Sequence, residues 1–345
     1  MKSSFSMTVN VAYSTSDSYS KCTGISILSL YENNRNIVNL NVYVITINVT
    51  EENIVKLQDI AKTYGRRIEF VNVTDELVNL KKTLELESFR GSYSVYCTLI
   101  MDKIFPHLEK ILVIDSDTII NGSISELWET NIENHALALV PEIGLYGKIS
   151  SSEDHDVLYR HSTYYNTGVL LYNLNKWRAD NVNKLILVGV KRHKKKYRIF
   201  DQSIINHLLN DKILRLKLKY NFYAAVHGIT YSTLQRIFSQ KKVFLEREFI
   251  EATNNPVIIH FTGFPFERPW YEQGVTPYNS MYRSYSALSP WATEALEKLP
   301  KHEDLILYVF YTVARLLRKF GFYNFYHWYR YVLGQKVKRR LGGRG

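Results

Sequence analysis

The stretch ILVIDSD, from Ile111 to Asp117, places an acidic pair directly after four consecutive apolar residues. A short, wholly apolar run is typical of a parallel strand that is covered on both faces of its sheet. Ligands of α/β sheets bind beyond the carboxyl ends of the strands, so this strand would deliver Asp115 and Asp117 to a ligand-binding edge. The stretch therefore predicts an α/β fold and marks the first place to look for chemistry.

Strand-like and helix-like segments alternate on both sides of this stretch. We expect strands over 8–13, 40–47, 68–73, 111–114, 169–174 and 257–261, and helices over 23–31, 50–65, 93–105, 175–193 and 201–210. Alternation at this spacing predicts a parallel sheet with right-handed crossovers and with helices on its faces.

The composition is that of a globular protein with a substantial core. Of its 345 residues, 46% are hydrophobic and 22% are charged, which excludes a disordered or fibrous protein. Two cysteines, Cys22 and Cys97, are too few for a disulfide framework and favour a reducing compartment. Residues 1–10 lack a signal-peptide core, and the apolar run 305–314 is shorter than the about 20 residues of a membrane span. We therefore expect a cytoplasmic protein without a membrane span.

Positive charge is concentrated near the C-terminus. The chain has 44 Lys and Arg against 33 Asp and Glu, and residues 311–345 contain nine of the basic residues and no acidic one. The preceding 310 residues are therefore almost neutral, with 35 basic and 33 acidic residues. An enzyme of nucleic acid would more often spread its charge over a working face, so we expect no nucleic-acid partner. The basic run 191–198 is interpreted as a solvated helix end.

The acidic pair needs a positive partner, because two carboxylates held this close repel each other. Oxygen ligands select a hard divalent cation, Mn²⁺ or Mg²⁺. His260 ends a second apolar strand and can add a neutral nitrogen, a mixture that suits Mn²⁺ better. The alternatives are a strand-end cap at Asp115 and Asp117 and a core histidine at 260. A second acidic pair, Asp154 and Asp156, is interpreted as a solvated loop.

Residues that follow His260 suit an anionic ligand. Gly263 permits the backbone to approach a phosphate closely, and Arg268 could offer a fork of donors to a diphosphate. Asp201 and Gln202 open an apolar-periodic helix, for which helix capping is the alternative to a role in binding.

Four blocks, in order, resemble glycosyltransferase family 8. They are Asp115-Ser116-Asp117, Asn166-Thr167-Gly168-Val169, Asp201-Gln202 with Asn206, and His260-Phe261-Thr262-Gly263 before Arg268-Pro269-Trp270. The resemblance covers residues 8–275 and implies the GT-A fold, a Rossmann-like nucleotide-sugar domain with a mixed sheet, over residues 7–280. Residues 281–345 would then form a helical, basic and aromatic C-terminal segment.

The resemblance also implies a UDP-sugar donor and a set of site residues. Asp115, Asp117 and His260 match the ligands of a manganese ion that holds the diphosphate, with Mg²⁺ as the alternative, and Tyr19 matches the aromatic residue beside uracil. The nucleotide and its diphosphate would further contact Tyr13, Ser14, Thr15, Ser16, Asp17, Ser116, Gly263 and Arg268.

Around the donor sugar, the resemblance implies three roles. The turn from Asn166 to Gly168 would face the sugar, and Asp201 would bind its hydroxyl groups. Gln202 would lie close to the anomeric carbon, and Glu142 would direct a carboxylate toward the sugar or the acceptor. Asp201, Gln202 and Glu142 are thus the candidate catalytic residues.

Three positions differ from the family pattern. Ser16, with Asp17 beside it, stands where an acidic residue recognises uracil. Thr98 stands where the pattern has an arginine, and Arg268 replaces a lysine. These differences concern the affinity for the donor and the choice of nucleotide.

Aromatic and basic residues alternate near the C-terminus. From Tyr308 to Tyr331, 11 of 24 residues are aromatic. Aromatic rings prefer the membrane interface, and each basic residue near an anionic leaflet contributes on the order of 1 kcal/mol. The pattern predicts peripheral attachment to the anionic inner face of the cell membrane. The alternative is a helix packed on the body with a basic end.

Together these features predict a retaining, Mn²⁺-dependent hexosyltransferase. The donor would be UDP-glucose or UDP-galactose, and the acceptor a lipid-linked or protein-linked glycan, such as a precursor of lipopolysaccharide, capsule or a glycoprotein glycan. The alternative, suggested by Thr98 and Ser16, is a catalytically impaired module that binds a nucleotide sugar or a glycan.

Overall fold

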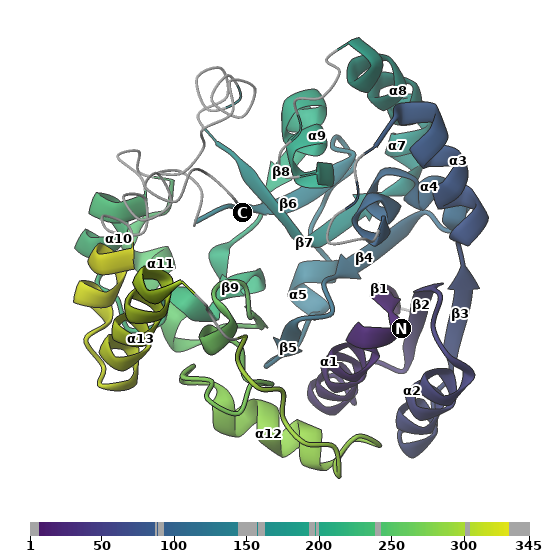
Figure 1. Cartoon of the computed structure of the whole chain (residues 1–345). Helices are drawn as coiled ribbons and strands as arrows, with labels where there is room; N and C mark the ends of the chain where they lie inside the picture. Colours follow the sequence, from purple (N-terminus) through teal and green to yellow (C-terminus); the bar gives the residue numbers. More distant parts are fainter. Residues whose placement is uncertain are drawn as a thin grey trace, which may run out of the picture.

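The computed structural model describes residues 7–86, 88, 93–143, 157, 163–192, 197, 200–238, 243–300 and 304–330. Within them, helices cover both faces of a seven-stranded sheet, as expected of an α/β protein (Figure 1). The acidic pair at 154 and 156 and the basic residues after 330 lie outside the described residues.

The large sheet is mixed. Its strand order is β3 (Ile68–Asn72), β2 (Asn39–Ile47), β1 (Thr8–Ser16), β4 (Lys110–Ile114), β7 (Tyr165–Asn173), β6 (Leu137–Pro141) and β8 (Ile213–Arg215). The first four strands are parallel, whereas β7 is antiparallel to both β4 and β6. The all-parallel sheet expected from strand–helix alternation is therefore wrong, and the mixed sheet implied by the family resemblance is correct.

A small sheet continues directly from the large one. Its order is β5 (Thr118–Ile120), β10 (Ile258–His260) and β9 (Phe222–Tyr223). Only three residues separate the end of β4 from β5, so the chain passes from one sheet to the other at the acidic pair. β10 is antiparallel to β5 and parallel to β9.

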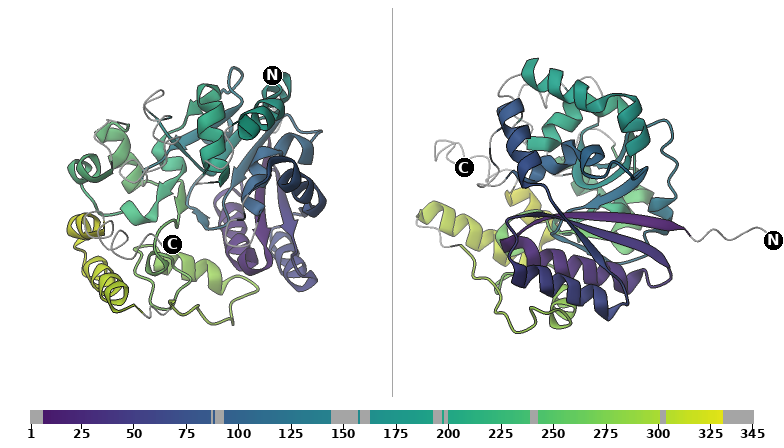
Figure 2. Two further views of the ribbon diagram at one scale, coloured as in Figure 1. Left: turned by 45° about the horizontal axis from the view of Figure 1, so that its top comes forward. Right: turned by 90° about the vertical axis from the view of Figure 1, so that its right-hand side faces the viewer.

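Helices pack on both faces of the large sheet, and a core lies on each side (Figure 2). One core includes α1 (Ser20–Asn33), α2 (Glu51–Thr63) and the small sheet, and the other is covered by α3 (Thr74–Leu84), α4 (Met101–Ile104), α7 (Leu174–Ala179), α8 (Val182–Arg192) and α9 (Phe200–Leu209). The described residues also form α5 (Ser125–Trp128), α10 (Tyr231–Phe238), α11 (Glu246–Asn254), α12 (Asn279–Ala287) and α13 (Leu305–Lys319), and residues 323–330 are helical.

Two predicted helices are each divided. The segment 93–105 forms a 3₁₀ helix, Ser94–Leu99, and then α4, because its aromatic and β-branched residues are weak helix formers. The segment 175–193 forms α7 and α8, which are separated at Asn181 with φ of 50°. Asparagine adopts this left-handed conformation more readily than most residues, so it ends the first helix.

The helix α1 is buried on all sides rather than amphipathic. Every residue from Cys22 to Tyr31 is buried, because α12 and the residues after it cover the side that faces away from the sheet. A Cβ on Gly24 would collide with the Trp291 ring, so glycine is required for this close contact. The position of α1 fixes the loop that precedes it.

The C-terminal helices pack on the body through one face. Ala314 of α13 and Tyr326 of the helical residues 323–330 are buried in a cluster with Phe266, and the buried Phe310 ring of α13 contacts Phe264. On the other side, large apolar side chains are exposed: Leu305, Ile306, Tyr308, Val309, Leu316, Phe320, Phe322, Phe325 and Trp328. In the described part of the chain, every helix is too short or too polar to cross a membrane.

Candidate active site

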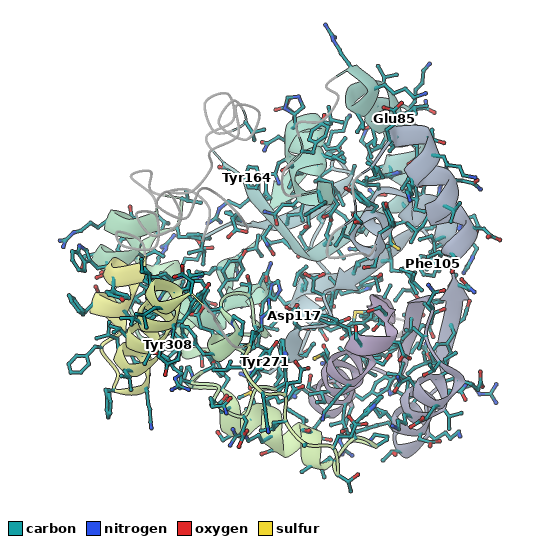
Figure 3. All side chains as sticks on the ribbon, in the orientation of Figure 1. Glu85, Phe105, Asp117, Tyr164, Tyr271 and Tyr308 are labelled. Atoms are coloured by element: carbon teal, nitrogen blue, oxygen red, sulfur yellow. The ribbon has the colours of Figure 1, made fainter. Side chains whose placement is uncertain are left out.

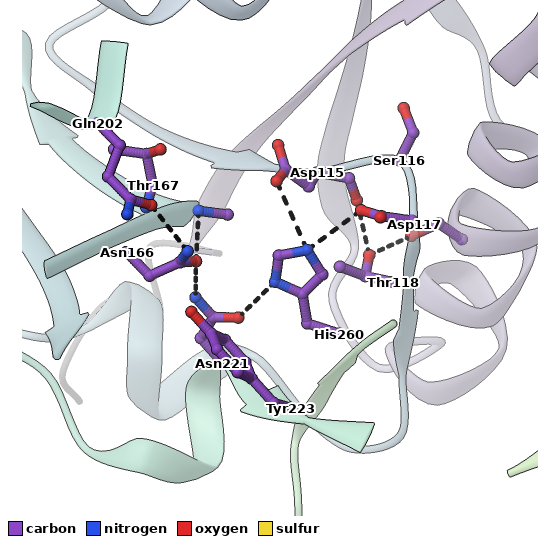
Figure 4. A network of polar contacts seen from close by, with 12 residues as sticks. Asp115, Ser116, Asp117, Thr118, Asn166, Thr167, Gln202, Asn221, Tyr223 and His260 are labelled. Carbon is purple, nitrogen blue, oxygen red and sulfur yellow. Dashed lines mark hydrogen bonds and ion pairs between the residues drawn. The ribbon is translucent and has the colours of Figure 1, made fainter. Parts of the chain in front are cut away.

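Three potential ligands converge where the two sheets meet (Figure 4). Asp115 and Asp117 follow β4, and His260 ends β10, in register with Thr118 of the neighbouring β5. The imidazole Nε2 lies 3.1 Å from Asp117 Oδ1 and 3.6 Å from Asp115 Oδ2. The ligand atoms of these three predicted residues lie within 4.8 Å of one another, so they can hold a metal ion.

Asn221 fixes the other nitrogen of the imidazole. His260 Nδ1 donates to Asn221 Oδ1 at 2.9 Å, and Asn221 Nδ2 donates in turn to Asn166 Oδ1 at 2.7 Å. With its proton on Nδ1, the neutral imidazole directs the lone pair of Nε2 at the acidic pair. Metal-binding histidines are commonly oriented by such a hydrogen bond, so His260 is arranged as a ligand.

The site holds strong opposing charges. Burial acts to raise the pKa of Asp117, but His260 and Arg268 outweigh it and bring the pKa to about 2. Burial likewise acts to lower the pKa of His260, but Asp117 and Asp115 outweigh it and raise the pKa. The carboxylates therefore favour positive charge between them, which a divalent cation would supply.

Gly168 brings the Asn166 segment against the metal trio. A Cβ at this position would lie 2.6 Å from His260 Nδ1 and 2.9 Å from Asn166 Oδ1, so only glycine fits. Its carbonyl oxygen accepts a hydrogen bond from Asp115 N at 2.8 Å. The segment lies within β7, so the expectation of a turn is wrong. It forms an irregularity in the strand: Val140 and Leu139 of β6 pair with Asn166 and Leu170, and residues 167–169 between them have no partner in β6.

The predicted sugar-facing residues share one hydrogen-bond network. Asn166 Nδ2 donates to Glu142 Oε2 at 3.0 Å and to Gln202 Oε1 at 2.9 Å. Glu142, which follows β6, also accepts from the Tyr223 hydroxyl at 2.7 Å. The Gln202 oxygen has a second donor, Thr167 N, at 3.2 Å. Asn221 and Asn166 connect this network to His260, so the donor-sugar residues and the metal trio form one unit.

Asp201 lies beside this network and has a raised pKa. It is the second residue of α9 and is 7% exposed. Burial raises its pKa to about 7, although the Thr98 hydroxyl, which donates to Oδ2 at 2.9 Å, opposes the rise. Thr98 replaces the arginine of the family pattern, so this aspartate has a neutral partner at that position. Near neutral pH its carboxyl group can both donate and accept hydrogen bonds.

Arg268 and Tyr19 are neighbours, as their predicted roles require. Arg268 Nη1 donates to the Tyr19 hydroxyl at 3.5 Å. The Nε of Arg268 is buried and has no hydrogen-bond partner among the described residues. Gly263 precedes it in the same segment and has φ of 136°, a conformation that favours glycine. A buried guanidinium donor without a partner is suited to an anionic ligand.

The first-strand residues divide between core and loop. Tyr13 is fully buried and its hydroxyl accepts from Ser26 Oγ at 3.3 Å, so its ring lies in the core and is not available to a nucleotide. Thr15 is also buried, and its hydroxyl oxygen lies within hydrogen-bond distance of Thr23 Oγ1, at 2.8 Å. These two side chains therefore support the loop from behind.

Ser14, Ser16 and Asp17 are only half-buried. Asp17 Oδ1 accepts from Thr50 N at 2.9 Å and from Thr50 Oγ1 at 2.7 Å, which ties the loop to the start of α2. Ser116, between the two aspartates, is 7% exposed and donates to Ser14 O at 3.0 Å. Asp17 and Ser116 thus hold the loop in place through their side chains.

Asn221 and Tyr223 were missed from the sequence. Both belong to the largely apolar stretch 218–226, in which Asn221 is the one asparagine. An asparagine in such a stretch is a signal of a buried amide, which needs hydrogen-bond partners, and Asn221 is fully buried in the structure. Which partners it has depends on the pairing of β9 with β10, and no local pattern reveals that pairing.

The family model described as glycosyl transferase family 8 matches residues 10–274. The chain belongs to this family. Relatives include the lipopolysaccharide 1,2-glucosyltransferase of Escherichia coli K12, 24% identical over 83% of this chain and 80% of that protein. The lipopolysaccharide 1,3-galactosyltransferase of Salmonella typhimurium is 25% identical over 83% of this chain and 80% of that protein. A Haemophilus influenzae relative is 28% identical over 63% of this chain, and the match spans 64% of that protein, less than two thirds of its length.

Solved structures share the fold. The galactosyltransferase LgtC, in a complex with donor and acceptor sugar analogues, is similar with a TM-score of 0.67 and 19% identity, over 83% of this chain and 98% of that chain. The bifunctional glycosyltransferase WbbM gives a TM-score of 0.69 and 22% identity over 85% of this chain, which spans about half of that protein, 52%. The family 8 chain therefore has the GT-A fold that its motifs imply.

Proposed function

We propose that this protein is a retaining hexosyltransferase that transfers glucose or galactose from a UDP-sugar to a cell-surface glycan precursor. The convergence of Asp115, Asp117 and His260 carries the proposal, together with the nearby Nε of Arg268, which has no hydrogen-bond partner in the described part of the chain. Transfer requires stabilisation of the charge that grows on a departing diphosphate, and a cation site next to a guanidinium supplies it. The lipopolysaccharide hexosyltransferases among the relatives support the same reaction class.

The metal trio suits Mn²⁺, with Mg²⁺ as the alternative, because it offers two carboxylates and one imidazole. A bound divalent ion would act as a Lewis acid toward the diphosphate. Arg268 would donate to the phosphate oxygens, and Tyr19 beside it would pack against the base.

On the other side of His260, the sugar would meet Asp201, Gln202 and Glu142. Asp201 can hydrogen-bond the sugar hydroxyls in either direction near neutral pH. The Gln202 amide is held by Asn166 and is a poor nucleophile, unlike the carboxylate of a retaining hydrolase. We therefore propose that the acceptor hydroxyl attacks the anomeric carbon on the face from which the diphosphate leaves, so that configuration is retained. The bond from this carbon to the diphosphate breaks as the new glycosidic bond forms, and the leaving phosphate takes the proton of the acceptor hydroxyl.

The test is turnover of a panel of UDP-sugars with Mn²⁺ and a lipopolysaccharide-core or lipid-linked glycan acceptor, measured as UDP release and as the mass gained by the acceptor. Asp117→Asn should lower the rate at least about a hundredfold by removing a metal ligand. Asp59→Asn, which changes an exposed carboxylate paired with Lys62 on α2, should leave the rate unchanged. Binding of UDP without release from any donor would instead favour the impaired binding module.

We also propose that the enzyme works at the anionic inner face of the cell membrane. Tyr308, near the left edge of Figure 3, belongs to the exposed apolar side of α13, and exposed rings continue through Phe322 and Trp328. Arg318 and Arg330 pair with the buried Glu267, and the other seven basic residues of 311–345 add attraction to anionic lipid. A lipid-linked or membrane-bound glycan acceptor would then be at hand.

Sedimentation with vesicles tests this location. The protein should bind phosphatidylglycerol-containing vesicles and lose this binding at high salt, because the attraction is largely electrostatic. Phe322→Asp combined with Trp328→Asp should weaken binding, whereas Val38→Asp, at a position 76% exposed outside this surface, should not. Equal binding of both variants would refute the assigned surface.

A further inference from the structure

A buried charge cluster surrounds Glu267, just beyond the metal trio. The Glu267 side chain is fully buried, and Oε2 accepts a hydrogen bond from Phe264 N at 2.7 Å. Arg330 Nη1 donates to Oε1 at 3.2 Å and to Oε2 at 2.9 Å, and Arg318 Nη1 lies 3.8 Å from Oε1. Three charged groups are thus withdrawn from water together, which is tolerable only while they remain paired.

The two arginines come from the C-terminal helices and make further contacts with the body. Arg318, on α13, donates to Ala225 O at 2.9 Å and to Ala224 O at 2.7 Å, directly after Tyr223 of the site. The Arg330 guanidinium lies over the Phe264 ring at 4.2 Å. The C-terminal helices are therefore attached to the two segments that follow β9 and β10, the strands of the small sheet that carry Tyr223 and His260.

Glu267 determines the course of the segment 261–268. Its Oε2 lies so close to Gly263 that a Cβ there would collide with it, so the carboxylate packs against the Gly263 backbone. The same oxygen holds Phe264 N, and the next residue along the chain is Arg268, whose side chain reaches Tyr19. A shift of the carboxylate would therefore move both Gly263 and Arg268.

We propose that Glu267, Arg318 and Arg330 position the segment Gly263–Arg268 for the diphosphate of the donor, which makes the C-terminal helices a part of the donor site. The three are positioning residues: they reach the ligand only through the backbone of this segment and through Arg268. The inference rests on the proposed function, because the proposed donor supplies the diphosphate.

Calorimetric titration of the full chain with UDP in the presence of Mn²⁺, and with Mn²⁺ alone, tests the proposal. Arg330→Met keeps much of the side-chain length but removes both hydrogen bonds to Glu267. We expect its dissociation constant for UDP to rise about tenfold, because a shift of Arg268 would weaken about one charge-assisted hydrogen bond to the diphosphate. Its affinity for Mn²⁺ alone should stay within about twofold, because the ligands of the trio are unchanged.

The matched control is Lys319→Met, which removes an exposed charge from the same helical region and should leave both affinities unchanged. Arg330→Lys keeps the charge and should recover most of the UDP affinity. If Arg330→Met fails to fold, Glu267→Gln provides the same test: it preserves volume and an acceptor for Phe264 N but weakens the pairing, and UDP affinity should fall.

The outcomes separate the two proposals. A folded Arg330→Met or Glu267→Gln protein with a lowered melting temperature but unchanged affinity for UDP would show a purely structural cluster and overturn the inference. Equal loss of UDP and Mn²⁺ affinity would also overturn it, since the effect would then extend to the trio. If the unchanged protein itself does not bind UDP, the proposed function fails, and the inference fails with it.

Discussion

Replacing Asn221 by leucine should weaken Mn²⁺ binding although every metal ligand remains. Asn221 is fully buried, and its Oδ1 accepts the proton of His260 Nδ1 at 2.9 Å. Leucine has the same number and branching of side-chain heavy atoms but offers no acceptor. The imidazole would then lose the hydrogen bond that fixes its tautomer and its direction toward Asp115 and Asp117.

The size of the effect follows from the contacts that are lost. Loss of a partner of a metal-binding histidine typically lowers metal affinity by about 10- to 100-fold, or about 1.4 to 2.7 kcal/mol. The second contact of Asn221, to Asn166 Oδ1, contributes less, because that oxygen retains a hydrogen bond from Gly168 N at 2.8 Å. We therefore expect the dissociation constant for Mn²⁺ to rise about 30-fold.

Electron paramagnetic resonance of free Mn²⁺ during a titration would measure this change directly. The matched control is Asn10→Leu, at the far end of β1, where the amide donates to Lys110 O at 3.3 Å and accepts from Asn41 at 2.9 Å. It removes two hydrogen bonds of a buried asparagine but should not alter Mn²⁺ affinity. Unchanged affinity in a folded Asn221→Leu protein would refute the assigned role of the amide.

Three further substitutions probe burial and close contacts. Burial holds the pKa of Asp201 at about 7 in the folded state, above the 3.8 of an exposed aspartate. The folded state therefore binds this proton more tightly than the unfolded state does, and the free energy of unfolding falls as pH rises from about 4 to 7. Asp201→Asn should therefore be more stable than the unchanged protein at pH 8, by up to about 4 kcal/mol, and equally stable at pH 4, in urea denaturation. Gly168→Ala should push the His260 ring aside and abolish Mn²⁺ binding in the same resonance titration. Gly24→Ala should cost about 1–3 kcal/mol of stability through its contact with Trp291, measured by thermal denaturation, while Mn²⁺ affinity is kept.

Elements with local signals were predictable from the sequence. Thr50 accepts a hydrogen bond from Asn53 N as the cap of α2, and Gly65, with φ of 63°, follows the end of that helix, both as their residue types indicate. The apolar runs that became β4 and β10 were found for the same reason. Each of these signals lies within a few residues of the feature that it predicts.

The strands of the small sheet could not be predicted in the same way. β5 has three residues and β9 has two, which is too short for a periodic pattern, and they form only because β10 lies between them. β10 pairs with β5, more than a hundred residues before it, and with β9, about 35 residues before it. No strand pattern predicts either pairing, so the approach of His260 to the acidic pair was expected from ligand chemistry and from the family resemblance. The contacts of Asn221 escaped prediction for this reason.

The spacing of the acidic pair has a structural reason that joins fold and chemistry. The chain bends at Ser116 and Asp117, and the Ser116 side chain points away from the two carboxylates (Figure 4). Ser116 is 7% exposed, and its hydroxyl accepts from Thr23 Oγ1 at 2.8 Å beneath the site. The side chains of Asp115 and Asp117, by contrast, are 53% and 16% exposed and face His260. Two adjacent aspartates would place one carboxylate where Ser116 lies, among neutral hydroxyl and carbonyl groups, and leave the cation a single acidic ligand. The junction of the two sheets therefore requires one small polar residue between the aspartates.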